Sequence, residues 1–131
     1  IGPRHWTVAS PDGAYVGCFA KDDEGNSQFN VVDTASGDMH QISHHPFSAT
    51  SAFTWRRDGQ AVAYVANGSV IELSITDGDF IRLTPQAAAD TAPTHHACVY
   101  SPDGTKIAFM NTVHATHKAF TQLFVVDSAG R

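Results

Sequence analysis

The sequence has few cysteines and few basic residues, and each shortage excludes a class of protein. Its two cysteines, Cys18 and Cys98, lie far apart and form no CxxC motif, which excludes a zinc ribbon and a thioredoxin-like redox motif. Both lie in apolar runs, so we predict reduced, buried thiols. Eight Lys and Arg against 13 Asp and Glu give a formal charge of −5, which excludes nucleic-acid binding through a basic surface.

Long hydrophobic runs are also missing. No stretch approaches the roughly 20 apolar residues of a transmembrane helix, so we expect no membrane span. There is no GxSxG elbow, P-loop or dinucleotide fingerprint either, so the corresponding hydrolase and nucleotide-binding classes have no support. The hydrophobic fraction is nevertheless 42%, which is enough for a packed core.

What the sequence does contain is an internal repeat. The turn SPDG occurs at Ser10–Gly13 and at Ser101–Gly104, and Arg56–Gly59 shares its Asp-Gly ending. The turn aspartates are Asp12, Asp58 and Asp103, with spacings of 46 and 45 residues. Asp-Gly between two apolar runs predicts a β-hairpin, because glycine accepts a positive φ. Repetition at every turn predicts a structural role for these aspartates.

Strand-like runs flank each turn in the same order, and the repeat unit is four antiparallel strands in about 45 residues, as in a propeller blade. We therefore predict an all-β fold, a β-propeller fragment of four-stranded antiparallel blades. Two blades are full and most of a third is present, in one partial domain over 1–131. The predicted blades span about 3–44, 49–85 and 94–131, and the last lacks its fourth strand.

Three blades are too few to close a propeller, which has about four to eight. We expect the sequence to be a fragment, completed by the remaining blades of a parent propeller or by other copies of the chain. The alternative is a three-sheet all-β domain that is not a propeller.

Several segments resemble TolB-type propeller repeats: the SPDG turn, the IAF strand after it, and the LFVVD and RLT strands. PRHW, SAFTW and VYSPDG look like the C-terminal part of an uncharacterised bacterial TolB-like family. More distantly, the sequence is similar to oligogalacturonate lyases, which have His at the start of inner strands. The GH…WD signature of WD-type propellers is absent. A bacterial origin leaves both cytoplasm and periplasm open.

Most histidines are predicted to gather on one face. Counting back seven residues from the turn aspartates gives His5, Ser51 and His96, where inner strands begin. Connections expected on the same face include His44–Thr50, Pro85–Thr94 and a loop over Thr112–Phe120. Only His40 falls in an outer strand. The histidines assigned to the face are His5, His44, His45, His95, His96, His114 and His117.

This face is the predicted binding site. The ligand-binding candidates are Arg4, His5, His44, His45, His95 and His96. Adjacent strand residues point to opposite sides, so we expect only one of His95 and His96 to face the channel. We favour His96, because His5 shares its register. The alternative for His44 and His45 is a solvated loop.

Imidazole is a common metal ligand, and the metal-binding candidates are His5, His96, His114 and His117. Three His with an oxygen ligand would suit a divalent ion such as Mn, Zn or Ni. The acidic run Asp22–Glu24 offers such oxygens on the same face. No other cofactor is indicated.

Two functions from different classes follow. The first is a scaffold that presents its His-rich channel face to a protein or oligosaccharide ligand, and we favour it. The second, implied by the likeness to oligogalacturonate lyases, is a metal-dependent polysaccharide lyase in the parent protein. In that case Arg4 and His5 are the catalytic candidates, together with His96. The residues leave open whether the protein is an enzyme.

Overall fold

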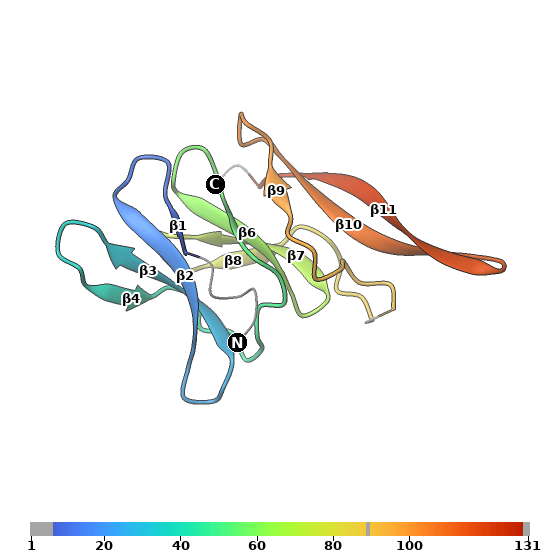
Figure 1. The fold of residues 1–131 in the computed structure, drawn as a ribbon, viewed down its shortest axis with the longest axis horizontal. Helices are drawn as coiled ribbons and strands as arrows, with labels where there is room; N and C mark the ends of the chain where they lie inside the picture. The colour runs from blue at the N-terminus through green and yellow to red at the C-terminus, as the bar shows by residue number, and fades with distance from the viewer. Residues whose placement is uncertain (1–6, 89, 130–131) are drawn as a thin grey trace.

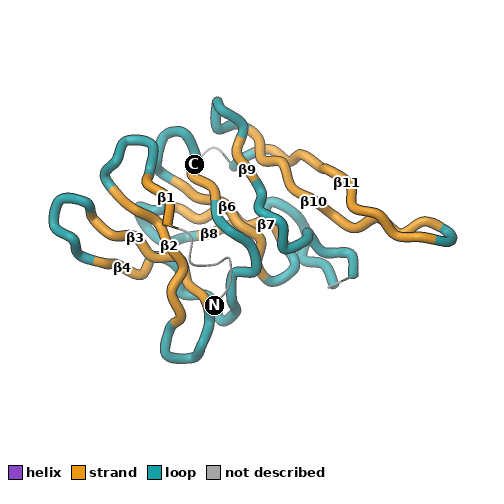
Figure 2. Tube along the Cα trace, in the orientation of Figure 1, coloured by secondary structure: helices purple, strands orange, loops and turns teal. Residues whose placement is uncertain are grey.

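The computed structural model describes residues 7–88 and 90–129, and within them the chain is all β (Figure 1). Three antiparallel sheets lie side by side, and the described part contains no helix (Figure 2). Nothing in these two ranges could cross a membrane as a helix. The strands are β1 (Thr7–Ala9), β2 (Tyr15–Lys21), β3 (Ser27–Asp33), β4 (Met39–Gln41), β5 (Thr54–Trp55), β6 (Ala61–Ala66), β7 (Ser69–Ser74), β8 (Phe80–Arg82), β9 (Val99–Tyr100), β10 (Lys106–Ala115) and β11 (Lys118–Asp127).

The sheets follow the chain order. The first sheet is β1-β2-β3-β4 and the second is β5-β6-β7-β8, so two four-stranded antiparallel units form as predicted. The third is β11-β10-β9, and no described strand pairs with the outer edge of β11. The first strands of the second and third sheets, β5 and β9, have only two residues each.

The three predicted Asp-Gly hairpins share one geometry. The Asp12 carboxylate accepts hydrogen bonds from the Ser10 hydroxyl at 2.7 Å and from the Ala14 backbone N–H at 3.0 Å. Asp58 and Asp103 accept equivalent bonds in the other two turns. The aspartates therefore hold the turns, as their repetition predicts.

The first and second sheets pack through an aromatic core. Phe19 and Phe29 of the first sheet contact Tyr64 of the second sheet and Phe53, which directly precedes β5. The contacts are mostly edge to face, and the Phe29 and Phe53 centroids lie 4.9 Å apart. Gly17 makes this approach feasible. A Cβ there would lie 2.9 Å from the Phe53 ring and 2.8 Å from the Phe29 ring.

The second and third sheets pack through a smaller apolar core and a buried ionic cluster. Glu72 of β7 is 2% exposed. It accepts hydrogen bonds from the hydroxyls of Tyr100 and Ser128, and the Arg56 guanidinium lies 3.6 Å away. Such pairing makes burial of a carboxylate tolerable. The apolar members are Ala63, Val65, Val70, Cys98, Tyr100, Ile107 and Phe109.

A long hairpin dominates the third sheet. β10 and β11 pair from Lys106–Asp127 to Ala115–Lys118, and the hairpin projects well beyond the other sheets (Figure 1). The predicted loop over Thr112–Phe120 is therefore wrong, because only residues 116–117 form a turn. Thr112 and Val113 in β10 and Phe120 and Thr121 in β11 are residues that favour a pleated surface.

Candidate functional site

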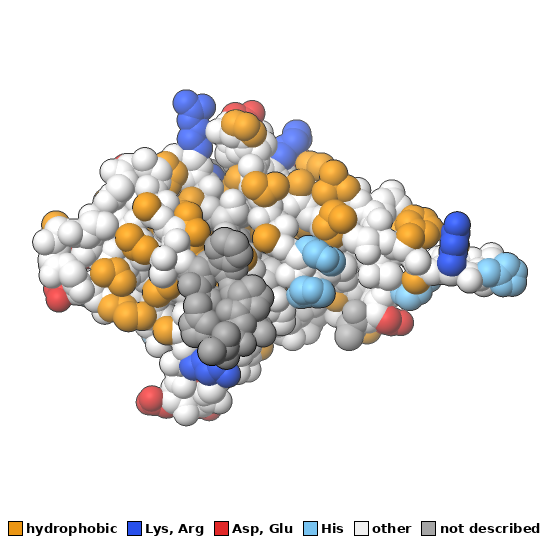
Figure 3. Space-filling model, viewed as in Figure 1, with side chains coloured by type: hydrophobic (Ala, Val, Ile, Leu, Met, Phe, Trp, Pro, Cys, Tyr) orange, Lys and Arg blue, Asp and Glu red, His pale blue; other side chains and the backbone are white. Residues whose placement is uncertain are grey.

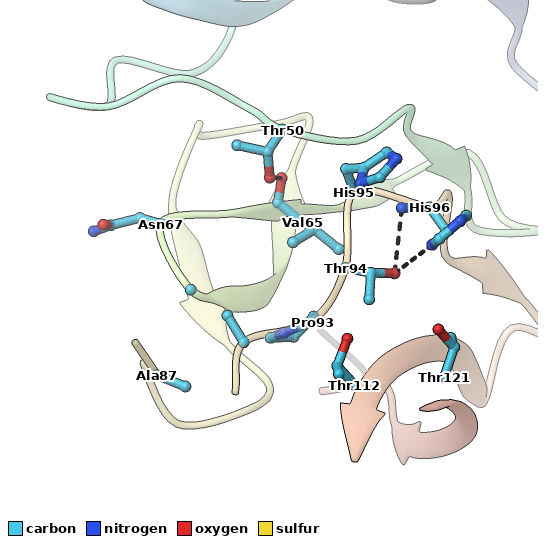
Figure 4. A pocket seen from close by; sticks show the side chains of 12 residues that line it. Thr50, Val65, Asn67, Ala87, Pro93, Thr94, His95, His96, Thr112 and Thr121 are labelled. Carbon is cyan, nitrogen blue, oxygen red and sulfur yellow. Dashed lines mark hydrogen bonds between the residues drawn. The ribbon is translucent and has the colours of Figure 1, made fainter. Parts of the chain in front are cut away.

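A pocket lies between the second and third sheets, at the end where β6 turns into β7 (Figure 4). Its volume of about 610 Å³ suits a small ligand, since such sites measure about 300–1,000 Å³. Four segments line it: Thr50, the β6–β7 turn, the connection before β9, and a facing pair on the long hairpin.

The β6–β7 turn forms one wall. Asn67 and Gly68 both have positive φ, 49° and 80°, as the Asn-Gly pair of a tight hairpin requires. The Gly68 carbonyl accepts a 3.0 Å hydrogen bond from the Ala87 N–H. A Cβ on Gly68 would lie 2.3 Å from the Ala87 carbonyl oxygen, so glycine lets the connection close against the turn.

The long hairpin holds the other wall in place. The Thr94 N–H donates to the carbonyl of Met110 in β10 at 2.9 Å, and the Asn111 amide donates to the Thr91 carbonyl at 3.2 Å. Further out along the hairpin, Nε2 of His114 donates to the backbone carbonyl of Asp90 at 2.8 Å. The connection before β9 is thereby fixed along the edge of β10.

His95 and His96 both line the pocket, in a bend before β9 and not in a strand. Their rings stack with centroids 4.7 Å apart and planes at 22°, so the prediction that they point to opposite sides is wrong. The alternation of a strand does not apply in a bend. The Thr94 hydroxyl hydrogen-bonds to Nδ1 of His96 at 2.7 Å and accepts its N–H at 3.4 Å, which positions that ring (Figure 4).

The polar groups of the pocket are uncharged hydroxyls, an amide and imidazoles. Thr112 and Thr121 face each other across the hairpin, and their hydroxyls point toward Thr94 and His96 (Figure 4). Within the described part of the chain neither hydroxyl has a hydrogen-bond partner. No Asp, Glu, Lys or Arg is among the lining residues. The site thus offers donors and acceptors without a fixed charge.

His44 and His45 lie elsewhere, where the connection after β4 meets the second sheet. His45 is 4% exposed. Its ring stacks on Phe47 at 4.5 Å and hydrogen-bonds to the Tyr64 hydroxyl at 2.7 Å. Burial, and then the positive charges of Arg82 and His44, lower the pKa of His45 to about 4. The structure does not bring these two histidines to the pocket, although His44 is exposed.

The described metal candidates do not fit a metal centre. His114 and His117 lie at the exposed far end of the hairpin, and His114 commits Nε2 to a carbonyl. The Asp22 carboxylate accepts hydrogen bonds from two backbone N–H groups of its own turn and from the Gln28 side chain. Residues 7–88 and 90–129 contain no group of three His, Cys, Asp or Glu able to hold a metal. Arg4 and His5 lie outside the described residues.

Sequence reasoning placed most of the lining segments on this face but named only His95 and His96 among the lining residues as binding candidates. The threonines and the Asn67–Gly68 turn, which supply much of the wall, were not among the candidates. The pairing of Thr112 with Thr121 was not predicted, because Thr112–Phe120 was assigned to a loop. The buried Glu72 was also missed, although a lone acidic residue within the apolar run SVIELSI is a usable signal.

By sequence, the chain is similar to an uncharacterized bacterial protein. No family model matches the chain. The uncharacterized protein YidR of Escherichia coli (strain K12) is 30% identical over 108 residues, which cover 82% of this chain and 26% of that protein. The chain thus spans about a quarter of the relative's length.

Solved structures are similar in fold. An oligogalacturonate lyase from Vibrio parahaemolyticus matches with a TM-score of 0.69 at 12% identity, over 95% of this chain and 36% of that one. TolB from Acinetobacter baumannii matches with 0.65 at 18%, over 99% and 32%. An oligogalacturonate lyase in complex with manganese matches with 0.70 at 15%, over 95% and 36%. At such identities the likeness is one of fold alone. The chain is therefore an all-β protein of antiparallel sheets whose structural neighbours are propeller proteins.

Proposed function

We propose that the chain is part of a β-propeller and that the pocket between its second and third sheets binds an uncharged polar ligand. The protein acts as a binding scaffold. The observation that carries this proposal is the lining of the pocket, where side-chain hydroxyls without partners face a stacked histidine pair. Unpaired polar groups in a concave site are suited to a ligand that supplies their hydrogen bonds.

The absence of Asp, Glu, Lys and Arg from the lining narrows the class of ligand. A carboxylate or phosphate is usually held by Arg or Lys, and neither lines the pocket. A neutral sugar or an uncharged peptide segment needs only hydrogen bonds. Thr121, Thr112 and Nε2 of His96 supply groups of this kind from two walls.

The lyase alternative has less support from the described residues. Elimination at a uronate needs a partner for the carboxylate and a base for the adjacent proton. A metal would stabilise the carboxylate when bound, but the described candidates do not form a ligand set. The catalytic candidates Arg4 and His5 stay predictions.

Ligand-observed NMR tests the proposal. The panel contains neutral mono- and disaccharides, galacturonate and short uncharged peptides, each added to the purified chain. We expect saturation transfer to a neutral ligand and none to galacturonate. Thr121→Val should weaken binding about 2- to 10-fold, the worth of one hydrogen bond.

Thr76→Val is the matched control, because Thr76 is exposed in the β7–β8 turn away from the pocket. An equal loss of binding affinity in both variants would contradict the assignment of the ligand to this pocket. Preferential binding of galacturonate would revive the lyase alternative.

A further inference from the structure

A cavity of about 370 Å³ lies between the first and second sheets, and it shares no lining residue with the pocket described above. The connection after β4, the β7–β8 turn and the start of β8 line it, through His44, His45, Gly78, Asp79 and Phe80. A Cβ on Gly78 would lie 2.8 Å from the Ile42 carbonyl oxygen, so the turn packs closely on the connection. The buried ring of His45 thus borders a space large enough to receive it.

His45 and Arg82 are held by the same aromatic ring. Histidine side chains are visible on the surface drawn in Figure 3, whereas His45 is only 4% exposed. Its ring stacks on Phe47, with centroids 4.5 Å apart and planes at 10°. The Arg82 guanidinium lies over the Phe47 ring as well, 5.6 Å from its centroid. A change in the position of His45 would therefore reach Arg82 through Phe47.

Arg82 in turn holds one wall of the pocket. Its Nη1 donates to the Asn67 carbonyl at 3.2 Å and to the Ser69 hydroxyl at 3.0 Å. Asn67 and Gly68 line the pocket (Figure 4). Contacts thus run without a break from the connection after β4 to the turn that forms the pocket wall.

The site of the His45 ring favours its neutral form. Nε2 hydrogen-bonds to the hydroxyl of Tyr64 in β6 at 2.7 Å, and Tyr64 is itself fully buried. Burial, Arg82 of β8 and the neighbouring His44 each lower the pKa of His45. A protonated ring is therefore unstable in this position and gains from leaving it.

Two carboxylates are connected to the surroundings of His45. Asp22 accepts a hydrogen bond from Nε2 of Gln28, which also donates to the His45 carbonyl, so this acid is linked to the backbone and not to the ring. Asp79 lines the cavity beside the ring. A protonated ring that turns into the cavity leaves the buried Tyr64 hydroxyl and approaches an opposite charge.

We propose that His45 is an acid-sensitive switch for the pocket wall. The neutral ring stays stacked on Phe47, and Arg82 then holds the Asn67–Gly68 turn. The protonated ring turns into the cavity toward Asp79. Phe47 loses its stacking partner, and Arg82 releases the turn. Protonation of histidine is an established way to change a packed interface. The inference rests on the proposed function for its consequence, which is weaker ligand binding in acid.

NMR spectroscopy tests the switch on the 131-residue chain without any ligand. We expect the Asn67 side-chain amide and the Gly68 backbone amide to shift with the same midpoint as the His45 ring. This midpoint should lie between the ordinary pKa of 6.5 and the folded value of about 4. The amides of Ile107 and Phe109, buried in the other core, should keep their native shifts, which separates the switch from unfolding.

Three variants identify the groups involved. His45→Phe keeps an aromatic ring against Phe47 but takes up no proton, so both amides should stop responding to pH. Arg82→Met should also abolish their response, while the His45 ring still titrates with a higher midpoint, because a repelling charge is gone. His44→Phe is the control, since His44 is exposed and should leave the response of both amides in place.

Two results would overturn the inference: a His45 ring that titrates while the Asn67 and Gly68 amides do not shift, or an amide response that persists in both His45→Phe and Arg82→Met. Affinity for a neutral disaccharide of the panel should fall about 2- to 10-fold toward the acid end, because a loosened wall must be ordered again on binding. If no neutral ligand binds at any pH but the amides follow His45, the proposed function fails and the switch stands.

Discussion

The buried carboxylate of Glu72 in the second sheet accepts a hydrogen bond from the hydroxyl of Tyr100 in the third. The Ser128 hydroxyl and the Ala129 N–H also donate to this carboxylate, at 2.6 and 2.8 Å. Burial and the neighbouring carboxylate raise the pKa of Tyr100, so the phenol stays protonated and remains a donor. One carboxylate thus joins two sheets.

Removing this bond should destabilise the fold measurably. Tyr100→Phe should cost about 1.5–3 kcal/mol, the worth of a hydrogen bond to a charged group. Glu72→Gln should cost about 3–5 kcal/mol, because it removes the buried negative charge that pairs with Arg56 and accepts hydrogen bonds from Tyr100 and Ser128. Urea denaturation followed by far-UV circular dichroism measures both free energies of unfolding.

The exposed pair Lys106 and Asp127, 2.6 Å apart, provides the control for these variants. Exposed ion pairs contribute at most about 1 kcal/mol, so Lys106→Gln should change stability little. If Tyr100→Phe costs no more than Lys106→Gln, the cluster does not hold the sheets together.

Gly68 and Gly13 have nearly the same positive φ, 80° and 76°, but different surroundings. Gly13→Ala should cost only the left-handed backbone penalty of about 1–2 kcal/mol, because nothing lies within 4 Å of its Cβ position. Gly68→Ala should cost about 1–3 kcal/mol more through overlap with the Ala87 carbonyl. Urea denaturation compares the two, and equal costs would mean that the connection is not packed on this turn.

His45 should make stability depend on pH between about 4 and 6.5. Its folded pKa of about 4 lies below the unfolded value of 6.5, so in this window the unfolded chain binds the extra proton. Stability is therefore full above pH 6.5 and falls as the pH drops toward 4, by roughly 3 kcal/mol. Denaturation midpoints at several pH values measure the slope.

His45→Phe should flatten that slope, whatever its effect on stability at neutral pH. His44→Phe is the neighbouring control, since His44 is exposed and should leave the slope in place. If the slope of stability against pH is unchanged in His45→Phe, another group causes the pH dependence.

Chelation should leave the described site intact. The scaffold proposal predicts that dialysis against a chelator changes neither ligand binding nor thermal stability, because the pocket uses hydroxyls and imidazoles without a metal. Elemental analysis before and after dialysis checks this. About one equivalent of Mn, Zn or Ni that is lost in a His5→Ala, His96→Ala double variant would support the lyase alternative instead.

Much of the fold follows from local signals. Asp-Gly pairs and alternating apolar residues predicted the hairpins, because both are set by neighbours in the sequence. The outer part of the β10–β11 hairpin, Thr112–Phe120, was mistaken for a loop, since Thr116 and His117 are not typical turn residues. Its existence depends on pairing across the hairpin.

The site was harder to predict, because it depends on contacts between sheets. Histidine counting found His95 and His96, but it could not show that a bend stacks their rings. The same counting included His45, whose surroundings in the core come from Phe47 and Tyr64. The positions of side chains between two sheets depend on tertiary packing, and local sequence patterns do not reveal this packing.

The bonds from Ser128 and Ala129 to Glu72 also determine how the molecule responds to mechanical force. Tension applied beyond residue 129 would reach the second sheet through the buried carboxylate before it could peel β11 away from β10. Two sheets would then share the force, and the hydrogen bonds of the β10–β11 hairpin would not break one after another. Glu72 therefore acts as an anchor at the point where the last described strand leaves its sheet.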